Sequence, residues 1–214
     1  MQILANGGGI AGTNSYLIAD ESAKLAVLFD APDHTTAPLL DEAAKRGWDI
    51  IGLWLTHGHF DHVADHAVVT GRFPNAKVLI HQLDEPKLQN PNASPFPLPF
   101  VIPPRKADAY VVDEQELRIG NLRVVVMHTP GHSAGHVMYH FPEQKILVGG
   151  DLIIMGSVGR TDLPDSDVSD LQDSIRRVMA LPHDTQLLPG HGPPSRLQDE
   201  ISGNPFVIEA MKQA

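Results

Sequence analysis

The chain has 214 residues, 42% of them hydrophobic, and contains no cysteine, which excludes disulfide bonds, thiolate metal ligands and a cysteine nucleophile. Its 26 acidic and 16 basic residues give a formal net charge of −10, so its surface repels phosphate backbones and no nucleic-acid partner is expected. No run is apolar enough for a membrane span and the N-terminus lacks a basic region, so we expect one cytoplasmic domain, residues 1–214, without a membrane partner.

The first third of the chain alternates strand and helix signals. Residues 14–18 and 25–29 predict two short strands. The glycine-rich run 7–12 before them lacks the Gly-Lys-Ser/Thr ending of a phosphate-binding loop, so we expect a flexible hairpin there. Thr36 is expected to cap a helix through about Arg46, which Gly47 ends.

A short apolar run at 50–55 predicts a buried strand, followed by a loop and a helix over 63–69 that has Asp61 and His62 at its start. Residues 84–104 contain seven prolines, a density that excludes regular helix. This segment is either a substrate wall or a surface connector.

The second half predicts short strands and two helices. Strands are expected at 122–127, 137–141, 145–148 and 186–188. The helix over 167–181 has an apolar stripe of Val168, Leu171, Ile175 and Val178, and a terminal helix capped by Asn204 and Pro205 has Phe206, Val207, Ala210 and Met211 as its packing face.

Residues 57–62 hold four side chains that can bind metal, namely His57, His59, Asp61 and His62. They follow the strand at 50–55, and Gly58 lets the backbone turn closely enough for both neighbouring imidazoles to face one point. Imidazole and carboxylate are the ligands of zinc and similar metals. A histidine-rich surface loop is the alternative, but H-x-H-x-D-H is far denser in ligands than such loops.

The same arrangement recurs later in the chain, because His132, Asp151 and His191 each follow a short apolar strand in a glycine-containing loop. We expect the four strand ends to meet at one edge, where seven ligands exceed what one tetrahedral ion needs. Two ions about 3.5–4 Å apart would use them all.

The chain resembles the metallo-β-lactamase superfamily, and within it the glyoxalase II-like (hydroxyacylglutathione hydrolase-like) metallohydrolases. The matching motifs are THGHFDH at 56–62, TPGHSAGH at 129–136, GGD at 149–151, GRTDLP at 159–164 and PGHG at 189–192. The resemblance implies an α/β fold with a four-layer αββα sandwich and the metal site at one edge of its two sheets. It also implies that His57, His59 and His132 hold one ion, that Asp61, His62 and His191 hold the other, and that Asp151 bridges them.

Two divalent ions lower the pKa of a shared water, which would give a bridging hydroxide near neutral pH. Asp61 would orient this hydroxide, and one ion would polarise the substrate carbonyl. A thiol leaves as thiolate without a proton donor because its pKa is about 8.5, whereas an amine needs protonation. A small-molecule thioester or activated ester is therefore the expected substrate, with zinc, iron or manganese as the metal.

Arg160 lies in the loop where glyoxalase II carries a lysine that contacts glutathione, so it is expected to bind a substrate carboxylate or carbonyl. An internal salt bridge between Arg160 and Asp162 is the alternative. The tyrosine that follows the last metal histidine in glyoxalase II is replaced here by Gly192-Pro193-Pro194, and the chain ends soon after Phe206, so glutathione specificity does not follow.

Two other functions remain open. A persulfide dioxygenase of the same superfamily would hold one iron through His57, His132 and Asp151, a two-histidine, one-carboxylate set. A non-catalytic metal-binding module would keep the fold without turnover.

Overall fold

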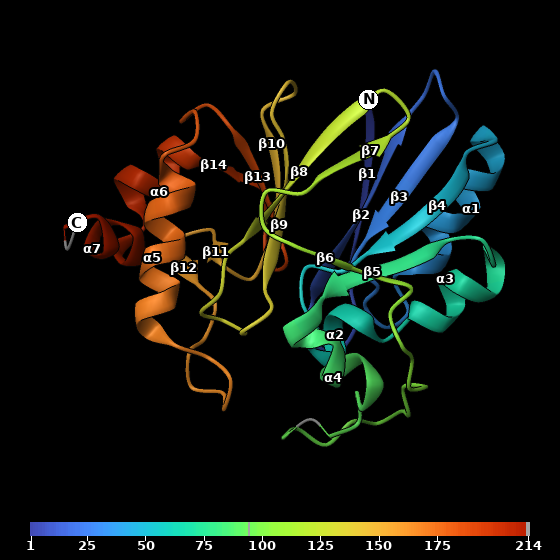
Figure 1. The fold of residues 1–214 in the computed structure, drawn as a ribbon, viewed down its shortest axis with the longest axis horizontal. Helices are drawn as coiled ribbons and strands as arrows, with labels where there is room; N and C mark the ends of the chain where they lie inside the picture. Colours follow the sequence, from blue (N-terminus) through green and yellow to red (C-terminus); the bar gives the residue numbers. More distant parts are fainter. Residues whose placement is uncertain (94, 213–214) are drawn as a thin grey trace. The chain divides into compact units, whose positions relative to one another are not determined.

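The computed structural model describes residues 1–93 and 95–212, and the chain folds as two units (Figure 1). Unit 1 contains residues 1–111 and 118–122, and unit 2 contains residues 112–117 and those from 123 onward. The boundary passes through the hairpin of β7 (Glu116–Ile119) and β8 (Leu122–His128). That residues 1–214 behave as one domain stays a prediction.

Unit 1 is built on a six-stranded sheet with the strand order β1-β2-β3-β4-β5-β6. The first three strands are antiparallel, whereas β3 to β6 run parallel. Residues that follow β3 and β4 therefore lie at the same edge of the sheet. The strands are β1 (Gln2–Gly8), β2 (Thr13–Asp20), β3 (Leu25–Phe29), β4 (Asp49–Trp54), β5 (Lys77–His81) and β6 (Ala109–Val111).

The helices of unit 1 include α1, which packs on one face of this sheet (Figure 1). Leu40 of α1 and Leu53 of β4 are fully buried in one apolar cluster, and each such leucine stabilises the fold by about 1.5–3 kcal/mol. Gly47 ends α1 as predicted, with a φ of 67° and its N–H donating to Ala43 and Ala44 carbonyls. The helical segments are α1 (Thr36–Arg46), α2 (Phe60–Val63), α3 (His66–Arg72), the 3₁₀ turn η1 (Gln82–Asp84) and α4 (Glu85–Gln89).

Three details of unit 1 differ from the sequence prediction. Thr35 rather than Thr36 is the N-cap residue of α1. The single helix predicted over 63–69 is wrong, because the N–H of Asp65 donates to the carbonyl of Ala31 at 2.8 Å and so divides α2 from α3. The exclusion of helix from 84–104 is also wrong, since α4 has Pro86 in its first turn, where proline breaks no helical hydrogen bond.

Unit 2 is built on a second sheet with the strand order β14-β13-β10-β9-β8-β7 and a small sheet of β11 and β12. β9 is antiparallel to both β8 and β10, and β13 is parallel to β10. Strands β8, β10 and β13 therefore run in one direction and end at one edge. The remaining bounds are β9 (Val137–Phe141), β10 (Ile146–Gly150), β11 (Ile153–Ile154), β12 (Ser157–Val158), β13 (Gln186–Pro189) and β14 (Ser195–Arg196).

Helices α5 (Val168–Met179), α6 (Leu197–Gly203) and α7 (Pro205–Lys212) pack on one face of the second sheet (Figure 1). Asp167 caps α5, accepting hydrogen bonds from the N–H groups of Ser169 and Asp170.

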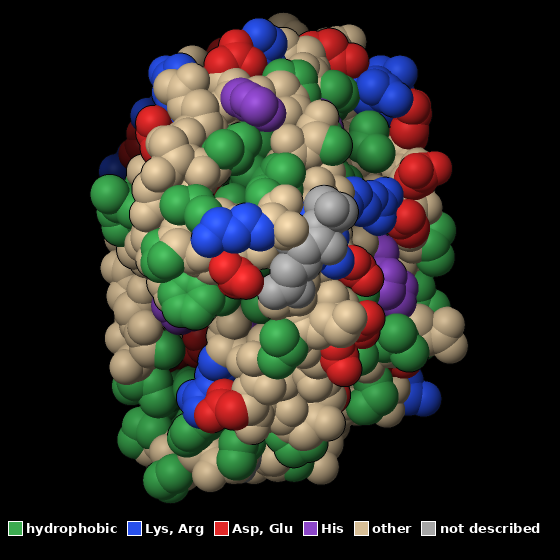
Figure 2. Space-filling view, turned by 90° about the vertical axis from the view of Figure 1, so that its left-hand side faces the viewer, with side chains coloured by type: hydrophobic (Ala, Val, Ile, Leu, Met, Phe, Trp, Pro, Cys, Tyr) green, Lys and Arg blue, Asp and Glu red, His purple; other side chains and the backbone are tan. Residues whose placement is uncertain are grey.

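Some predicted packing residues of these helices are solvent-exposed instead. Val168, Phe206 and Met211 are 54%, 51% and 42% exposed, so the predicted stripes were too wide. Figure 2 looks onto the side that carries α5 to α7, where hydrophobic side chains lie among charged ones. Across the described part of the chain, no helix combines the length and apolarity needed to span a bilayer.

Candidate metal centre

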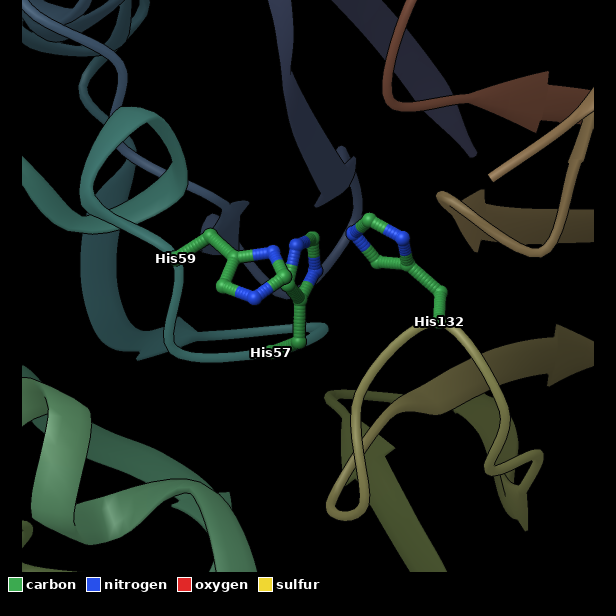
Figure 3. Close-up of side chains that lie close together, drawn as sticks. All are labelled: His57, His59 and His132. Carbon is green, nitrogen blue, oxygen red and sulfur yellow. The ribbon is translucent and has the colours of Figure 1, made fainter. Parts of the chain in front are cut away.

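Unit 1 brings together the four ligands predicted from H-x-H-x-D-H. His57 and His62 are fully buried, and their ring centroids lie 4.0 Å apart. The rings of His57 and His59 meet edge to face with centroids 4.6 Å apart (Figure 3). Asp61 Oδ2 lies 3.5 Å from His62 Nε2. The half-site of unit 1 is therefore a group of three imidazoles and one carboxylate.

Asp30 organises this half-site, although its role was not predicted from the sequence. It directly follows β3, which is parallel to β4, so it lies beside the start of the ligand loop. Its carboxylate accepts hydrogen bonds from the Thr56 N–H and hydroxyl, both at 2.8 Å, and lies 2.8 Å from His62 Nδ1. A carboxylate on one ring nitrogen of a histidine fixes the ring so that the other nitrogen can bind metal.

Hydrogen bonds also orient His57 and Gly58. The Thr56 hydroxyl donates to Asp30, so it can accept from His57 Nδ1 at 3.0 Å, which assigns the proton of a neutral His57 to Nδ1. The Gly58 N–H donates to Asp84 Oδ2 at 2.6 Å, and a Cβ on Gly58 would lie 2.7 Å from the Asp84 carbonyl oxygen. A side chain at position 58 would therefore collide with the Asp84 backbone, so the close approach of the ligand loop to η1 requires glycine.

Unit 2 brings together the other three predicted ligands, because β8, β10 and β13 end at one edge. Asp151 Oδ2 lies 3.5 Å from His132 Nε2 and 3.2 Å from His191 Nε2. The Gly190 N–H donates to the Gly150 carbonyl at 2.7 Å, which ties the loops after β13 and β10 together. His132, also labelled in Figure 3, belongs to the loop between β8 and β9.

Further contacts hold the ligands of unit 2 in place. His132 Nδ1 lies 2.9 Å from the carbonyl oxygen of Arg160. The Asp151 N–H donates to His136 Nε2 at 3.0 Å, so the proton of His136 lies on Nδ1, which is 2.9 Å from the Thr129 hydroxyl. His136 thus fixes the backbone of the aspartate that is predicted to bridge two ions.

Gly159 packs closely against two of these predicted ligands, Asp151 and His132. A Cβ on Gly159 would lie 1.9 Å from the carbonyl oxygen of Asp151 and 2.9 Å from the ring of His132. Real Cβ atoms do not approach backbone this closely, so only glycine fits without moving the ligand loops. This restricted position was not identified from the sequence.

Arg160 forms the ion pair that was the alternative to substrate binding. Its Nε and Nη2 donate to the two carboxylate oxygens of Asp162 at 2.6 and 2.8 Å, and both side chains are largely exposed. The hydrogen bond to Asp162 raises the pKa of Arg160, and that to Arg160 lowers the pKa of Asp162. A cavity of about 340 Å³ is lined by residues 158–161 with α5 and α7, and a substrate-binding role for Arg160 stays a prediction.

His66 is not a predicted ligand, but its burial should make the stability of the fold depend on pH. Burial lowers its pKa below the usual 6.5 although Nε2 bonds to the Pro103 carbonyl. The folded chain therefore takes up a proton on His66 at a lower pH than the unfolded chain, in which the pKa is the usual 6.5. Stability should fall with decreasing pH below 6.5, by at most about 1.4 kcal/mol per pH unit from this group.

We expect His66→Gln to reduce this slope in denaturant unfolding measured from about pH 7.5 to 5. His183→Gln is the control, because His183 is exposed and its replacement should leave the slope as it is. A wild-type slope in His66→Gln would contradict the assignment.

The donor set fits a borderline divalent metal. Nitrogen and carboxylate oxygen donors suit zinc, iron and manganese, and no thiolate is present in the sequence to select a softer ion. His57, His62 and His132 each have Nδ1 within hydrogen-bonding distance of an oxygen atom, which is the outer support that metal-binding histidines carry.

Comparison with known proteins identifies the family of the chain. A family model described as "Metallo-beta-lactamase superfamily" matches residues 8–191. "Probable metallo-hydrolase YqgX" of Bacillus subtilis is 30% identical over 203 residues, which cover 94% of each chain. "Hydroxyacylglutathione hydrolase GloC" of Haemophilus influenzae is 30% identical over 209 residues, which cover 91% of this chain and 92% of that protein.

Solved structures agree with this match. BLEG-1, described as a B3 metallo-β-lactamase, has a TM-score of 0.88 at 30% identity and covers 96% of this chain and 99% of its own. TTHA1623 in a di-iron-bound form has a TM-score of 0.82 at 34% identity, covering 95% and 99%. ETHE1 from Myxococcus xanthus has a TM-score of 0.79 at 25% identity, covering 100% and 91%. The chain therefore belongs to the metallo-β-lactamase superfamily and has its α/β fold, as the sequence motifs predicted.

Proposed function

We propose that this metal-dependent hydrolase of the metallo-β-lactamase superfamily cleaves thioesters or activated esters with two divalent metal ions. The proposal rests on one observation, which is that each unit holds a set of supported His and Asp side chains at strand ends. Unit 1 supplies His57, His59, Asp61 and His62, and unit 2 supplies His132, Asp151 and His191.

In the proposed centre, His57, His59 and His132 would hold one ion, Asp61, His62 and His191 would hold the second, and Asp151 would supply a carboxylate to both. When bound, the ions supply a Lewis acid for the substrate carbonyl and lower the pKa of water enough to provide a nucleophile near neutral pH. Asp61 would also accept a hydrogen bond from the water that acts as nucleophile and so orient it.

The leaving group selects the substrate class. A thiol with a pKa of about 8.5 departs as thiolate without a donor, whereas an amine requires a proton. In our assignment the imidazoles and carboxylates of the predicted ligands bind metal, so none of them is assigned to protonate a leaving amine. Thioesters and activated esters are therefore favoured over amides.

Two relatives support the proposal. GloC is named for the hydrolysis of a hydroxyacylglutathione, which is a thioester. TTHA1623 binds two iron ions, so a related chain accommodates a binuclear centre.

The test is an assay of the metal-loaded protein on S-lactoylglutathione and on a nitrophenyl ester, with a β-lactam as the amide. We expect turnover of the first two to exceed that of the β-lactam, to disappear with a chelator and to return with zinc, iron or manganese. Metal-loaded protein without thioester or ester turnover, or with activity that resists complete metal removal, would refute the proposal.

A mononuclear-iron persulfide dioxygenase is the second candidate. It would use His57, His132 and Asp151 to hold one iron. TTHA1623 supports iron as the metal of a related chain, although it binds two irons rather than one. One iron per chain with oxygen consumption on a persulfide substrate would replace the hydrolase proposal.

Arg160 is proposed to bind an anionic group of the substrate. Arg160→Ala should then raise KM for a thioester that carries a carboxylate by roughly tenfold with little change in kcat, because a charge-assisted hydrogen bond contributes about 1.5 kcal/mol. Asp162→Ala removes the competing partner of the guanidinium and should lower KM. An unchanged KM in Arg160→Ala would remove this residue from the binding site.

A further inference from the structure

One face of β2 begins with two small hydroxyl side chains where a core strand usually carries apolar ones. Thr13, Ser15 and Leu17 alternate along this face, and all three are fully buried. Burying a hydroxyl is unfavourable unless it forms a hydrogen bond. The partners of Thr13 and Ser15 therefore indicate why these residues are present.

The Thr13 hydroxyl binds a member of the half-site in unit 1, and the Ser15 hydroxyl binds Asp30, which supports that half-site. The Ser15 hydroxyl donates to the Asp30 carbonyl at 2.7 Å, and Asp30 in turn holds His62. The Thr13 hydroxyl donates to Asp61 Oδ2 at 2.7 Å, across 48 residues of sequence. Thr13 thus contacts the carboxylate of Asp61, which is proposed both to bind metal and to orient the attacking water.

The oxygen that Thr13 contacts is the one nearest to the second ligand of the same predicted ion. Asp61 Oδ2 lies 3.5 Å from His62 Nε2 as well as 2.7 Å from the Thr13 hydroxyl. A carboxylate oxygen has two lone pairs, so one can accept from Thr13 while the other faces a metal ion. The hydrogen bond then fixes the rotation of the carboxylate about its last bond.

The backbone before Thr13 holds this hydroxyl in place. Gly12 has a φ of 69°, which ends the turn between β1 and β2 and starts β2 at Thr13. Thr13 pairs with Gly8 in the β1–β2 register, and its branched Cβ restricts its side-chain rotation. The strand position and the restricted rotation of Thr13 therefore favour the observed hydrogen bond to Asp61.

We propose that Thr13 is a positioning residue that presents Asp61 Oδ2 to the ion held by Asp61, His62 and His191. This inference rests on the proposed binuclear hydrolase. Hydrogen-bonded partners of ligating carboxylates typically contribute 10–100-fold in metal affinity or activity. Thr13 acts through Asp61 and does not touch the substrate.

The test uses Thr13→Val, which keeps the shape and removes the hydroxyl, and Thr13→Ser, which keeps the hydroxyl. Thr36→Val is the matched control, because Thr36 is also fully buried and donates to a carboxylate, that of Asp65, at 2.9 Å. Asp65 is not a predicted ligand. Zinc dissociation constants from chelator competition, the absorption spectrum of the cobalt-substituted protein, and kcat and KM are measured for all four proteins.

For Thr13→Val we expect about 10–100-fold weaker zinc binding at one of the two sites, an altered cobalt spectrum and a lower kcat. Thr13→Ser should stay close to wild type, and Thr36→Val should match wild type in metal binding. Equal zinc affinities and spectra in Thr13→Val and wild type, or equal losses in Thr13→Val and Thr36→Val, would overturn the assignment. A wild-type protein that binds two ions but hydrolyses neither a thioester nor an activated ester would overturn the proposed function. The ratio of zinc affinities between Thr13→Val and wild type would still test the role of Thr13.

Discussion

Asp61→Ala is expected to lower kcat/KM for a thioester by about 10²–10⁴-fold, the usual loss when a group that directs proton and water positions is removed. Asp61 is buried in α2, accepts the Thr13 hydroxyl and lies beside His62 Nε2. Metal content should fall by at most one ion per chain, because His57, His59 and His132 are assigned to the other ion, so activity should fall much more than metal content. Elemental analysis and initial rates on the same preparation provide both quantities.

Asp65→Ala is the matched control for Asp61→Ala. Asp65 also accepts a hydrogen bond from a buried threonine, Thr36, but it lies after α2 and outside the ligand set. It should retain wild-type turnover once folded. An Asp61→Ala protein with wild-type kcat/KM would refute the role given to Asp61. If metal content and activity fell in parallel, Asp61 would be a metal ligand only and would not orient the water.

Gly159→Ala is expected to disturb metal binding although the residue is no ligand. Its Cβ would lie 1.9 Å from the Asp151 carbonyl oxygen and 2.9 Å from the His132 ring, so one or both ligand loops must move. Movement of this loop also strains the bond between His132 Nδ1 and the Arg160 carbonyl. We expect zinc affinity to fall more than about tenfold and the free energy of unfolding to fall by about 1–3 kcal/mol.

Gly203→Ala is the control for adding a methyl group to unit 2. Gly203 lies in α6, and a Cβ there would meet no described atom within 4 Å. Alanine favours helix over glycine, so this variant should be as stable as wild type or more stable by about 0.5–1 kcal/mol. If Gly159→Ala and Gly203→Ala bound zinc equally well, the close contact of Gly159 with Asp151 and His132 would not be needed to position these predicted ligands.

The clustering of the candidate ligands within each unit could be predicted from the sequence because its signals are local. His57, His59, Asp61 and His62 are adjacent in the chain, and each later ligand follows a short apolar strand. Within unit 2, the common direction of β8, β10 and β13 places His132, Asp151 and His191 together, as this pattern implied.

The supporting residues were not predictable in the same way. Asp30 is 26 residues from its partner Thr56 in the sequence, and Thr13 is 48 residues from its partner Asp61. A single Asp or Thr at the end of a strand has many ordinary roles, so neither residue stands out in the sequence. The break between α2 and α3 depends on the Ala31 carbonyl, again a partner distant in sequence. The α4 helix was missed because a count of prolines ignores that Pro86 lies in a first turn, where it is tolerated.

The central claim is the proposed assignment of His57 and His132 to the same ion, and metal content per chain tests it most directly. Elemental analysis should give two ions in wild type, and one ion each in His57→Ala, in His132→Ala and in the double variant, because both histidines are assigned to one ion. A wild-type chain that takes up no transition metal would contradict the account. So would a double variant that has lost both ions, because each histidine would then hold a different ion.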